Sequence, residues 1–392
     1  MLEAWLMELL KALGRLFLNP LLYWSIFLVL LVGYRRVKRD RIKFGSKVFD
    51  VFSEWKGTWG LSILIGIFIS LVTIGIGFVF AYETIILLSV VAILLSLSLR
   101  FSLLSASYTF GIGYILLLLL PIFLENQSYF SQDLFSNTNF TALTILLGFF
   151  LLVEAQLLRK TERNETFPNL VLGQRGGWIG QHFIKKLAII PFFTLIPAGT
   201  ITSFAPYWPY FSIGEETYSL ILVPFIIGFE QSVKGSLPHR AAVKIAKSVF
   251  LLAIIVIAMA IGSIFVSWLS IATVIVAILG REFINYRHRV QDNEKRPYFH
   301  QSDSGLQVLS VIPGSPAARL EILVGETITK VNGQKIKTEQ QFYEALQETG
   351  AFFKLELLDD IGEIRFVQSA IYEGDHHELG LIFTSRPHRE GK

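Results

Sequence analysis

Long apolar runs, bounded by charged or turn-forming residues, fill most of the first 280 positions of the chain. A run of roughly 20 apolar residues can cross the hydrocarbon core of a membrane as a helix. The last run, 249–280, would be about 48 Å long as one helix, which exceeds a bilayer, so it predicts two spans that turn near Ser267 and Trp268. The pattern therefore predicts a transmembrane domain over 16–280 with eight or nine helices. In the nine-helix form the spans are 16–34, 59–80, 84–99, 101–124, 140–157, 187–204, 218–229 and two within 249–280.

The first fifteen residues carry a different pattern, because their apolar side chains recur at helical spacing among charged ones. Such a pattern predicts an amphipathic helix over 1–15 that lies flat at the membrane interface. An entry helix ahead of the first span is favoured over a sensor of membrane curvature. The apolar positions are Leu2, Trp5, Leu6, Leu9, Leu10 and Leu13.

Composition strengthens the membrane interpretation. The chain is 52% hydrophobic and only 17% charged, and its mean hydropathy is +0.53. These values are far too apolar for a soluble chain of 392 residues. Cysteine does not occur in the sequence, which excludes disulfides, thiolate nucleophiles and cysteine metal sites.

The distribution of Lys and Arg predicts which connections face the cytoplasm. Segments 35–47, 159–186, 234–247 and 281–297 are rich in basic residues, whereas 125–139 and 205–216 contain no Lys or Arg. Positive charge is retained on the cytoplasmic side. We therefore expect a basic cytoplasmic linker at 281–297, followed by a cytoplasmic domain. With nine spans the N-terminus lies outside, and with eight it lies inside.

From residue 298 onward the pattern is typical of a small α+β domain. Alternating runs and turn residues predict the order strand, helix, strand, helix, strand. Ser315 can cap a short first helix, and Asn332-Gly333 suits the positive φ angles of a tight hairpin turn. Thr338 and Gln341 form a capping box that opens the second helix.

The stretch Glu378-Leu379-Gly380-Leu381 resembles the Gly-Leu-Gly-Phe carboxylate-binding loop of PDZ domains. In most PDZ domains that loop comes early, so its late position here implies a circularly permuted arrangement. The resemblance implies the fold class: a polytopic α-helical membrane domain followed by a small α+β PDZ domain over 298–392.

A PDZ domain would have a groove for an extended peptide. Backbone N–H groups of the loop hold a C-terminal carboxylate, and the peptide adds a strand beside the strand that follows. The alternative interpretation is an ordinary bulged turn, or a groove that is occluded. The candidate peptide-binding residues are Glu378, Leu379, Gly380, Leu381 and Phe383 on the strand side, with Thr338, Phe342 and Ala345 on the helix side.

The sequence shows no motif for catalysis, a metal ion or a cofactor. A zinc protease needs two histidines one helical turn apart beside a glutamate, and the His-His-Glu run at 376–378 lacks that spacing. All seven histidines lie outside the predicted spans, so the buried serine–histidine pair of an intramembrane serine protease is not expected. Glu83, Glu154 and Glu230 lie near span ends, where a charge can reach water, so ion-coupled transport is not favoured.

Three stretches narrow the resemblance: 19–44, RGGWIGQH at 175–182 and IIPFFTLIPAG at 189–199. Together with the predicted architecture, they resemble the MinJ family of membrane adaptors of the division-site selection system in Bacillus and its relatives. The resemblance implies a non-enzymatic protein that bridges the polar and septal scaffold DivIVA to the ATPase MinD and also touches late division proteins. The alternative is a PDZ-bearing accessory subunit of a membrane protease or transporter.

Overall fold

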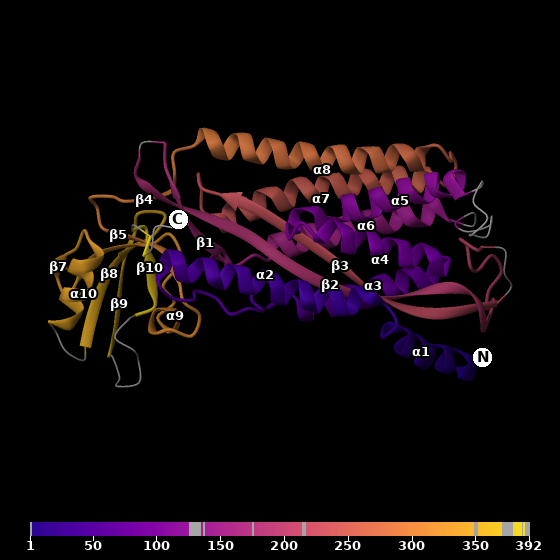
Figure 1. Ribbon diagram of the computed structural model, residues 1–392, viewed down its shortest axis with the longest axis horizontal. Coiled ribbons are helices and arrows are strands. Elements are labelled where there is room, and N and C mark those ends of the chain that lie inside the picture. Colours follow the sequence, from indigo (N-terminus) through magenta and orange to yellow (C-terminus); the bar gives the residue numbers. More distant parts are fainter. Residues whose placement is uncertain are drawn as a thin grey trace.

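The computed structural model describes residues 2–124, 135, 138–174, 176–213, 217–348, 352–370, 379–385 and 387–388. The molecule is elongated, with a helical bundle that carries a small mixed domain at one end and the N-terminus near the other (Figure 1). Six helices in the described ranges are long and apolar enough to span a membrane. They are α2 (Pro20–Phe44), α3 (Trp59–Ile76), α5 (Ala106–Leu124), α6 (Phe140–Arg159), α7 (Pro238–Gly262) and α8 (Leu269–Glu294).

A seventh apolar helix, α4 (Tyr82–Ser96), is shorter. Helices α7 and α8 are separated by a turn that includes Ser267 and Trp268, as the sequence predicts. Helix α8 continues to Glu294, so most of the predicted linker at 281–297 is the end of a helix. The short 3-10 helices are η1 (Phe101–Leu104) and η2 (Arg163–Glu165).

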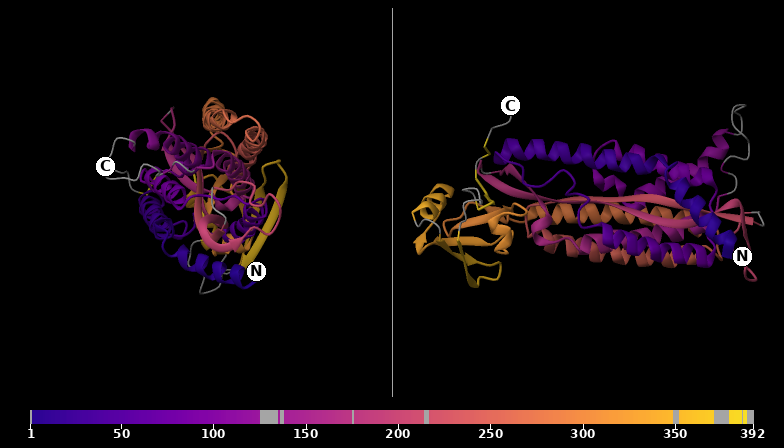
Figure 2. Two further views of the ribbon diagram at one scale, coloured as in Figure 1. Left: turned by 90° about the vertical axis from the view of Figure 1, so that its right-hand side faces the viewer. Right: turned by 90° about the horizontal axis from the view of Figure 1, so that it is seen from below.

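Two of the predicted transmembrane helices, 187–204 and 218–229, are strands. They form a long antiparallel hairpin of β2 (Trp178–Thr202) and β3 (Thr217–Val233), which runs through the length of the bundle (Figures 1 and 2). Their continuous apolar sequence cannot be distinguished from a buried helix by periodicity alone. Within the hairpin, Pro191 and Pro224 lie opposite each other. The eight- or nine-helix prediction is therefore wrong, because the described ranges contain seven apolar helices and these two strands where nine helices were expected.

The free edge of β2 is satisfied by other parts of the protein. Ser70 of α3 accepts a hydrogen bond from the Phe193 N–H at 2.8 Å. Thr73 donates to the Phe193 carbonyl at 2.5 Å. The backbone at Phe78–Phe80 bonds to both polar groups of Leu195. A strand edge cannot face lipid because its polar groups would be unsatisfied, so α3 makes a membrane-embedded hairpin possible.

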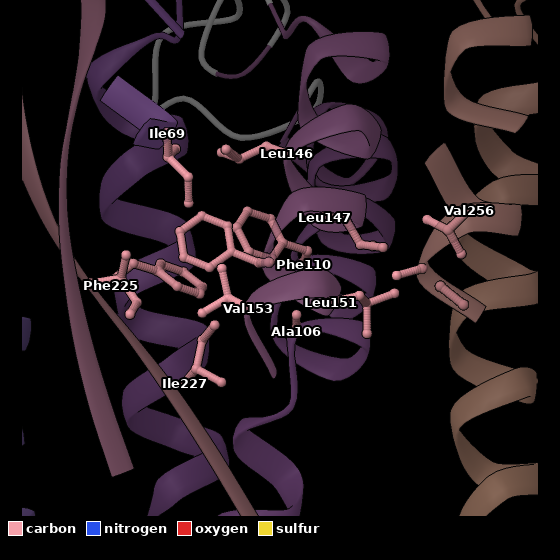
Figure 3. Packing of buried hydrophobic residues seen from close by; sticks show 14 of the residues in the cluster. Ile69, Ala106, Phe110, Leu146, Leu147, Leu151, Val153, Phe225, Ile227 and Val256 are labelled. Carbon is pink, nitrogen blue, oxygen red and sulfur yellow. The ribbon is translucent and has the colours of Figure 1, made fainter. Parts of the chain in front are cut away.

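The main core lies where the helices meet the hairpin. Figure 3 shows Phe110 of α5 and Phe225 of β3 close together beside side chains of α6. Their ring centroids are 4.6 Å apart, and Phe150 of α6 lies 4.9 Å from Phe225. Burial of such aromatic side chains is a large favourable contribution to folding.

The sequence predicts that Glu154 lies near a span end, where its charge can reach water. The structure shows that this prediction is wrong. Its side chain is fully buried and forms an ion pair with Arg281 of α8, with Oε1 and Nη2 2.7 Å apart. Ser105 donates a further hydrogen bond to Glu154 at 2.6 Å, and Asn285 accepts one from Arg281 at 2.6 Å. The carboxylate is therefore stabilised by a partner on another helix and not by water.

Helix α1 (Leu2–Leu16) packs against the end of the hairpin that lies away from the mixed domain (Figure 1). Ala12 and Glu8 are buried, and Glu8 accepts hydrogen bonds from Ser219 and Thr200. The opposite side of α1 exposes Leu6, Leu9, Leu10 and Leu13. An interfacial position for this helix remains a prediction.

The mixed domain has strand order β10-β5-β6-β8-β9, with β7 paired to β6. The last strand, β10, lies beside the first strand of the sheet, which confirms the permuted arrangement. Ser315 caps α9, Asn332 and Gly333 have positive φ angles, and Thr338 caps α10 as predicted. The elements are β5 (Leu306–Val311), α9 (Pro316–Arg319), β6 (Thr327–Val331), β7 (Gln334–Lys335), α10 (Glu339–Gln347), β8 (Phe352–Leu358), β9 (Ile364–Ala370) and β10 (Leu381–Phe383).

Two short strands connect the parts of the molecule. β1 (Phe167–Leu172) and β4 (Phe299–His300) both pair with the start of β2. The sheet of the membrane domain thereby extends beyond the bundle and reaches the mixed domain (Figure 1).

Candidate peptide-binding groove

The described part of the loop before β10 turns at Gly380. Gly380 has a φ of +78°, a conformation that favours glycine. Its carbonyl accepts a hydrogen bond from the Ile312 N–H at 2.8 Å, and the Leu379 carbonyl accepts one from Ala317 at 3.0 Å. A Cβ at position 380 would lie 2.2 Å from the Cβ of Ser315. Glycine is therefore required here by both backbone angle and space, whereas Glu378 lies outside the described residues.

The strand that follows the loop presents an edge toward α10. Gly380 and Ile312 form a hydrogen-bonded position between β10 and β5. Because such positions alternate along an antiparallel pair, the N–H and C=O of Leu381 point away from β5. In the sheet, the described strand paired with β10 is β5. An added strand would have to pair along this edge.

Four predicted side chains meet between β10 and α10. Leu381 and Phe383 lie in one buried cluster with Phe342 and Ala345. The rings of Phe342 and Phe383 are 5.2 Å apart and nearly perpendicular. Leu379 belongs to the same cluster. The predicted residues are thus brought together, but all of these except Phe383 form the core beneath a groove instead of an open lining.

The accessible part of the groove lies at the first turn of α10. A pocket of about 560 Å³ opens there, and its lining includes Thr338, Gln340 and Phe383. Thr338 is exposed and accepts a hydrogen bond from the Gln341 N–H at 3.2 Å. The returning bond of the capping box goes from the Lys337 N–H to Gln341 at 2.9 Å, one position earlier than the standard box. Two of the eight predicted residues, Thr338 and Phe383, line the pocket.

The mixed domain is held against the membrane domain by contacts that the sequence gave no signal for. Arg163 of η2 pairs with Asp360 at 2.9 Å and donates to the Val324 carbonyl at 2.5 Å. Asn164 accepts from the Val324 N–H at 2.9 Å. Arg240 of α7 also pairs with Asp360. Burial raises the pKa of Asp360, but the hydrogen bond and positive charge of Arg163, together with Arg240, outweigh it and hold the pKa below its ordinary value.

An apolar contact completes this junction. Ile382 and Leu309, on the outer face of the mixed-domain sheet, pack in a cluster with Phe49 and Phe167 of the membrane domain. The face of β10 that carries Ile382 is therefore covered by the membrane domain. In the described ranges, no group of three His, Cys, Asp or Glu residues could hold a metal ion.

Comparison with known proteins agrees with both parts of the architecture. A family model for the PDZ domain matches residues 307–357. Over 97% of its length the chain is 35% identical to the "Cell division topological determinant MinJ" of Bacillus subtilis, covering 96% of that protein. This chain belongs to the MinJ family. The probable MinJ of Lacticaseibacillus paracasei is 31% identical over 81 residues, 21% of this chain and 22% of that protein.

One solved structure is similar to part of this MinJ-family chain. It is the PDZ domain of an SdrC-like protein from Listeria monocytogenes, 20% identical, with a TM-score of 0.18, and it covers 21% of this chain and 90% of that one.

Proposed function

We propose that this chain is a non-enzymatic membrane adaptor that recruits division-site selection proteins and bridges a DivIVA-like scaffold to MinD. The observation that carries the proposal is its similarity to a topological determinant of cell division over 97% of the chain. A PDZ domain fixed to a multi-helix membrane domain offers the kind of surface that an adaptor needs. Late division proteins are further candidate partners.

The proposed location is the cell membrane at septa and poles, with several passes and the PDZ domain in the cytoplasm. Support comes from charge. The half of α2 nearer the PDZ domain carries Arg35, Arg36, Lys38, Arg39, Arg41 and Lys43. Basic residues accumulate on the cytoplasmic side of membrane proteins.

The proposed mode of recruitment is strand addition. An extended partner segment would pair with the Leu381 edge of β10, with its end near Gly380 and a side chain in the pocket at Thr338 and Phe383. The added hydrogen bonds give affinity, and the pocket gives selectivity.

The experiment uses two tryptophan substitutions on the same helix. Gln340→Trp fills the pocket at the first turn of α10, whereas Gln347→Trp changes an exposed residue of its last turn that does not line the pocket. Binding of purified MinD and of the DivIVA-like scaffold to the full chain in detergent is then measured. We expect Gln340→Trp to weaken one of the two interactions at least tenfold and Gln347→Trp to change both less than twofold.

Full retention of both interactions in Gln340→Trp would show that the groove is not the recruiting surface. A fluorescent fusion of the parent chain tests the wider proposal, because an adaptor of division-site selection must concentrate at septa and poles. Uniform membrane fluorescence of a functional fusion would contradict it. The surface position Gln340 is used for this test instead of Gly380. A side chain introduced by Gly380→Val would collide with Ser315 and disturb α9.

A further inference from the structure

A small basic cavity lies beside the PDZ-proximal half of α2, separate from the peptide groove. Its volume is about 220 Å³, and its lining includes Arg35, Arg39, Lys185 and Glu230. Lining residues come from α2, from the connection after α4, and from β2 and β3. Four cationic side chains and two carboxylates surround it.

The two carboxylates already have cationic partners. Glu54 pairs with Arg36 at 2.8 Å, and Glu230 pairs with Lys185 at 3.0 Å. Lys185 also lies 4.3 Å from the ring centroid of Phe101. The charges of these four groups therefore balance one another. Of the two remaining arginines at the cavity wall, Arg39 has only a long contact with Asp40, a residue that also pairs with Arg36 at 3.4 Å.

Arg39 has hydrogen-bond donors to spare. Its closest carboxylate contact is with Asp40 at 3.9 Å, which is too long for a hydrogen bond. Its Nε is buried and has no acceptor among the described residues. The guanidinium lies 5.3 Å from the ring centroid of Phe183, which fixes its position. Arg35 is exposed one helical turn earlier, and the described residues give its side chain no ion pair.

The short helix α4 explains why this space is open. The Trp24 indole donates to Ser96, the last residue of α4, at 2.7 Å. Helix α4 therefore ends beside the first half of α2, whereas α2 continues to Phe44. Beyond Ser96 the second half of α2 has no α4 beside it, and the cavity lies in that gap.

Helices α2 and α4 also expose apolar side chains, on faces next to the one that lines the cavity. Phe27, Leu30 and Tyr34 of α2 are 52%, 40% and 65% exposed, and Leu94 and Leu97 at the end of α4 are 58% and 57% exposed. Helices α2 and α4 contact each other. An elongated ligand could thus place an anionic group at the arginines and an apolar tail along these side chains.

We propose that this cavity binds the headgroup of an anionic phospholipid, whose phosphate is held between Arg35 and Arg39. A guanidinium presents paired N–H donors that match phosphate oxygens. Basic pockets between membrane helices are suited to anionic headgroups. The acyl chains lie along the exposed faces of α2 and α4. The site would fix the second half of α2, which contacts the PDZ domain's junction through Phe44 and Lys43.

The test compares two double variants of the full chain, purified in detergent and titrated with lipid under native mass spectrometry. Arg35→Gln/Arg39→Gln removes the two arginine charges proposed to hold the phosphate. Lys38→Gln/Arg41→Gln removes two exposed charges of the same helix that do not line the cavity. We expect the parent to bind phosphatidylglycerol at least tenfold more tightly than phosphatidylcholine. The cavity variant should lose at least tenfold in affinity for phosphatidylglycerol, and the control less than twofold.

Equal losses in the two variants would overturn the site, because they would indicate a general charge effect. Full competition by inorganic phosphate would overturn the lipid assignment in favour of a free anion. If the double cavity variant does not fold, Arg39→Lys is measured instead. A lysine keeps the charge but lacks the paired donors, so its affinity for phosphatidylglycerol should fall at least threefold, and unchanged affinity would refute the proposal.

Discussion

Pro191 and Pro224 lie directly opposite each other in the middle of the β2–β3 hairpin. Proline has no N–H, so it is tolerated in a strand only where that group is not needed for pairing. On the same strand, the N–H groups of Leu187, Phe193 and Leu195 point away from β3 and bond to residues outside the hairpin. These residues and Pro191 are separated by even numbers of positions, so the backbone of Pro191 faces the same way. The outward direction at Pro191 therefore carries no donor that would need a partner within the membrane.

Gly66 tests how closely α3 must approach this edge. A Cβ at position 66 would lie 2.1 Å from the Pro191 carbonyl oxygen, whereas a Cβ at Gly75 of the same helix has no neighbour within 4 Å. We expect Gly66→Ala to destabilise the protein by about 1–3 kcal/mol, because backbone must shift. Gly75→Ala should be neutral or stabilise by up to about 1 kcal/mol through reduced entropy of the unfolded chain. Thermal unfolding of both variants in one detergent measures the difference, and equal melting temperatures would contradict the close packing.

The buried pair of Glu154 and Arg281 gives a second prediction. Glu154→Gln leaves the Arg281 charge buried without its carboxylate, which should cost about 3–5 kcal/mol. The double variant Glu154→Leu/Arg281→Met removes both charges and should recover most of that loss. The exposed pair Lys47–Asp50 is the control, because Lys47→Met should cost less than about 1 kcal/mol. A double variant as unstable as Glu154→Gln would show that the pair is not the source of the effect.

Sequence patterns predicted the fold class and much of the PDZ domain, because caps and turns are local. Ser315, Asn332 and Thr338 act as expected within a few residues of their own positions. The hairpin was not predicted, since a continuous apolar strand and a buried helix share the same composition.

The candidate site was predicted in part. The sequence places Phe342 on the second helix and Phe383 on the last strand, on opposite sides of the predicted groove. The contact between their rings agrees with this placement. Their burial could not be inferred, because the depth of a groove depends on how far β10 and α10 are apart. The pairing of Arg163 with Asp360 joins residues 197 positions apart, and such a contact leaves no periodic or local pattern in one sequence.

Docking of the PDZ domain should depend on the charge of Asp360. Because its pKa is lowered below the ordinary 3.8 in the docked state, docking is fully supported at neutral pH and weakens as the pH falls through the lowered pKa. Asp360→Asn should weaken docking already at neutral pH. Hydrogen exchange at the Val324 amide, which donates to Asn164, reports the junction and should become faster in this variant. Asp303→Asn, at a fully exposed position, should leave the exchange rate unchanged, and equal rates in the two variants would contradict the role of Asp360.

The chain has no cysteine, so single introduced thiols can test which end of the molecule faces outward. The connection between β2 and β3 lies at the end away from the PDZ domain (Figure 1). Tyr207 in this connection is 92% exposed. Asp303 is fully exposed on the PDZ side. If the basic PDZ end is cytoplasmic, a membrane-impermeant maleimide should label Tyr207→Cys in intact protoplasts and Asp303→Cys only after permeabilisation. The labelled fraction is measured by mass shift on a gel. The reverse pattern would invert the topology, and labelling of both sites before permeabilisation in sealed protoplasts would contradict placement of these two ends on opposite sides of the membrane.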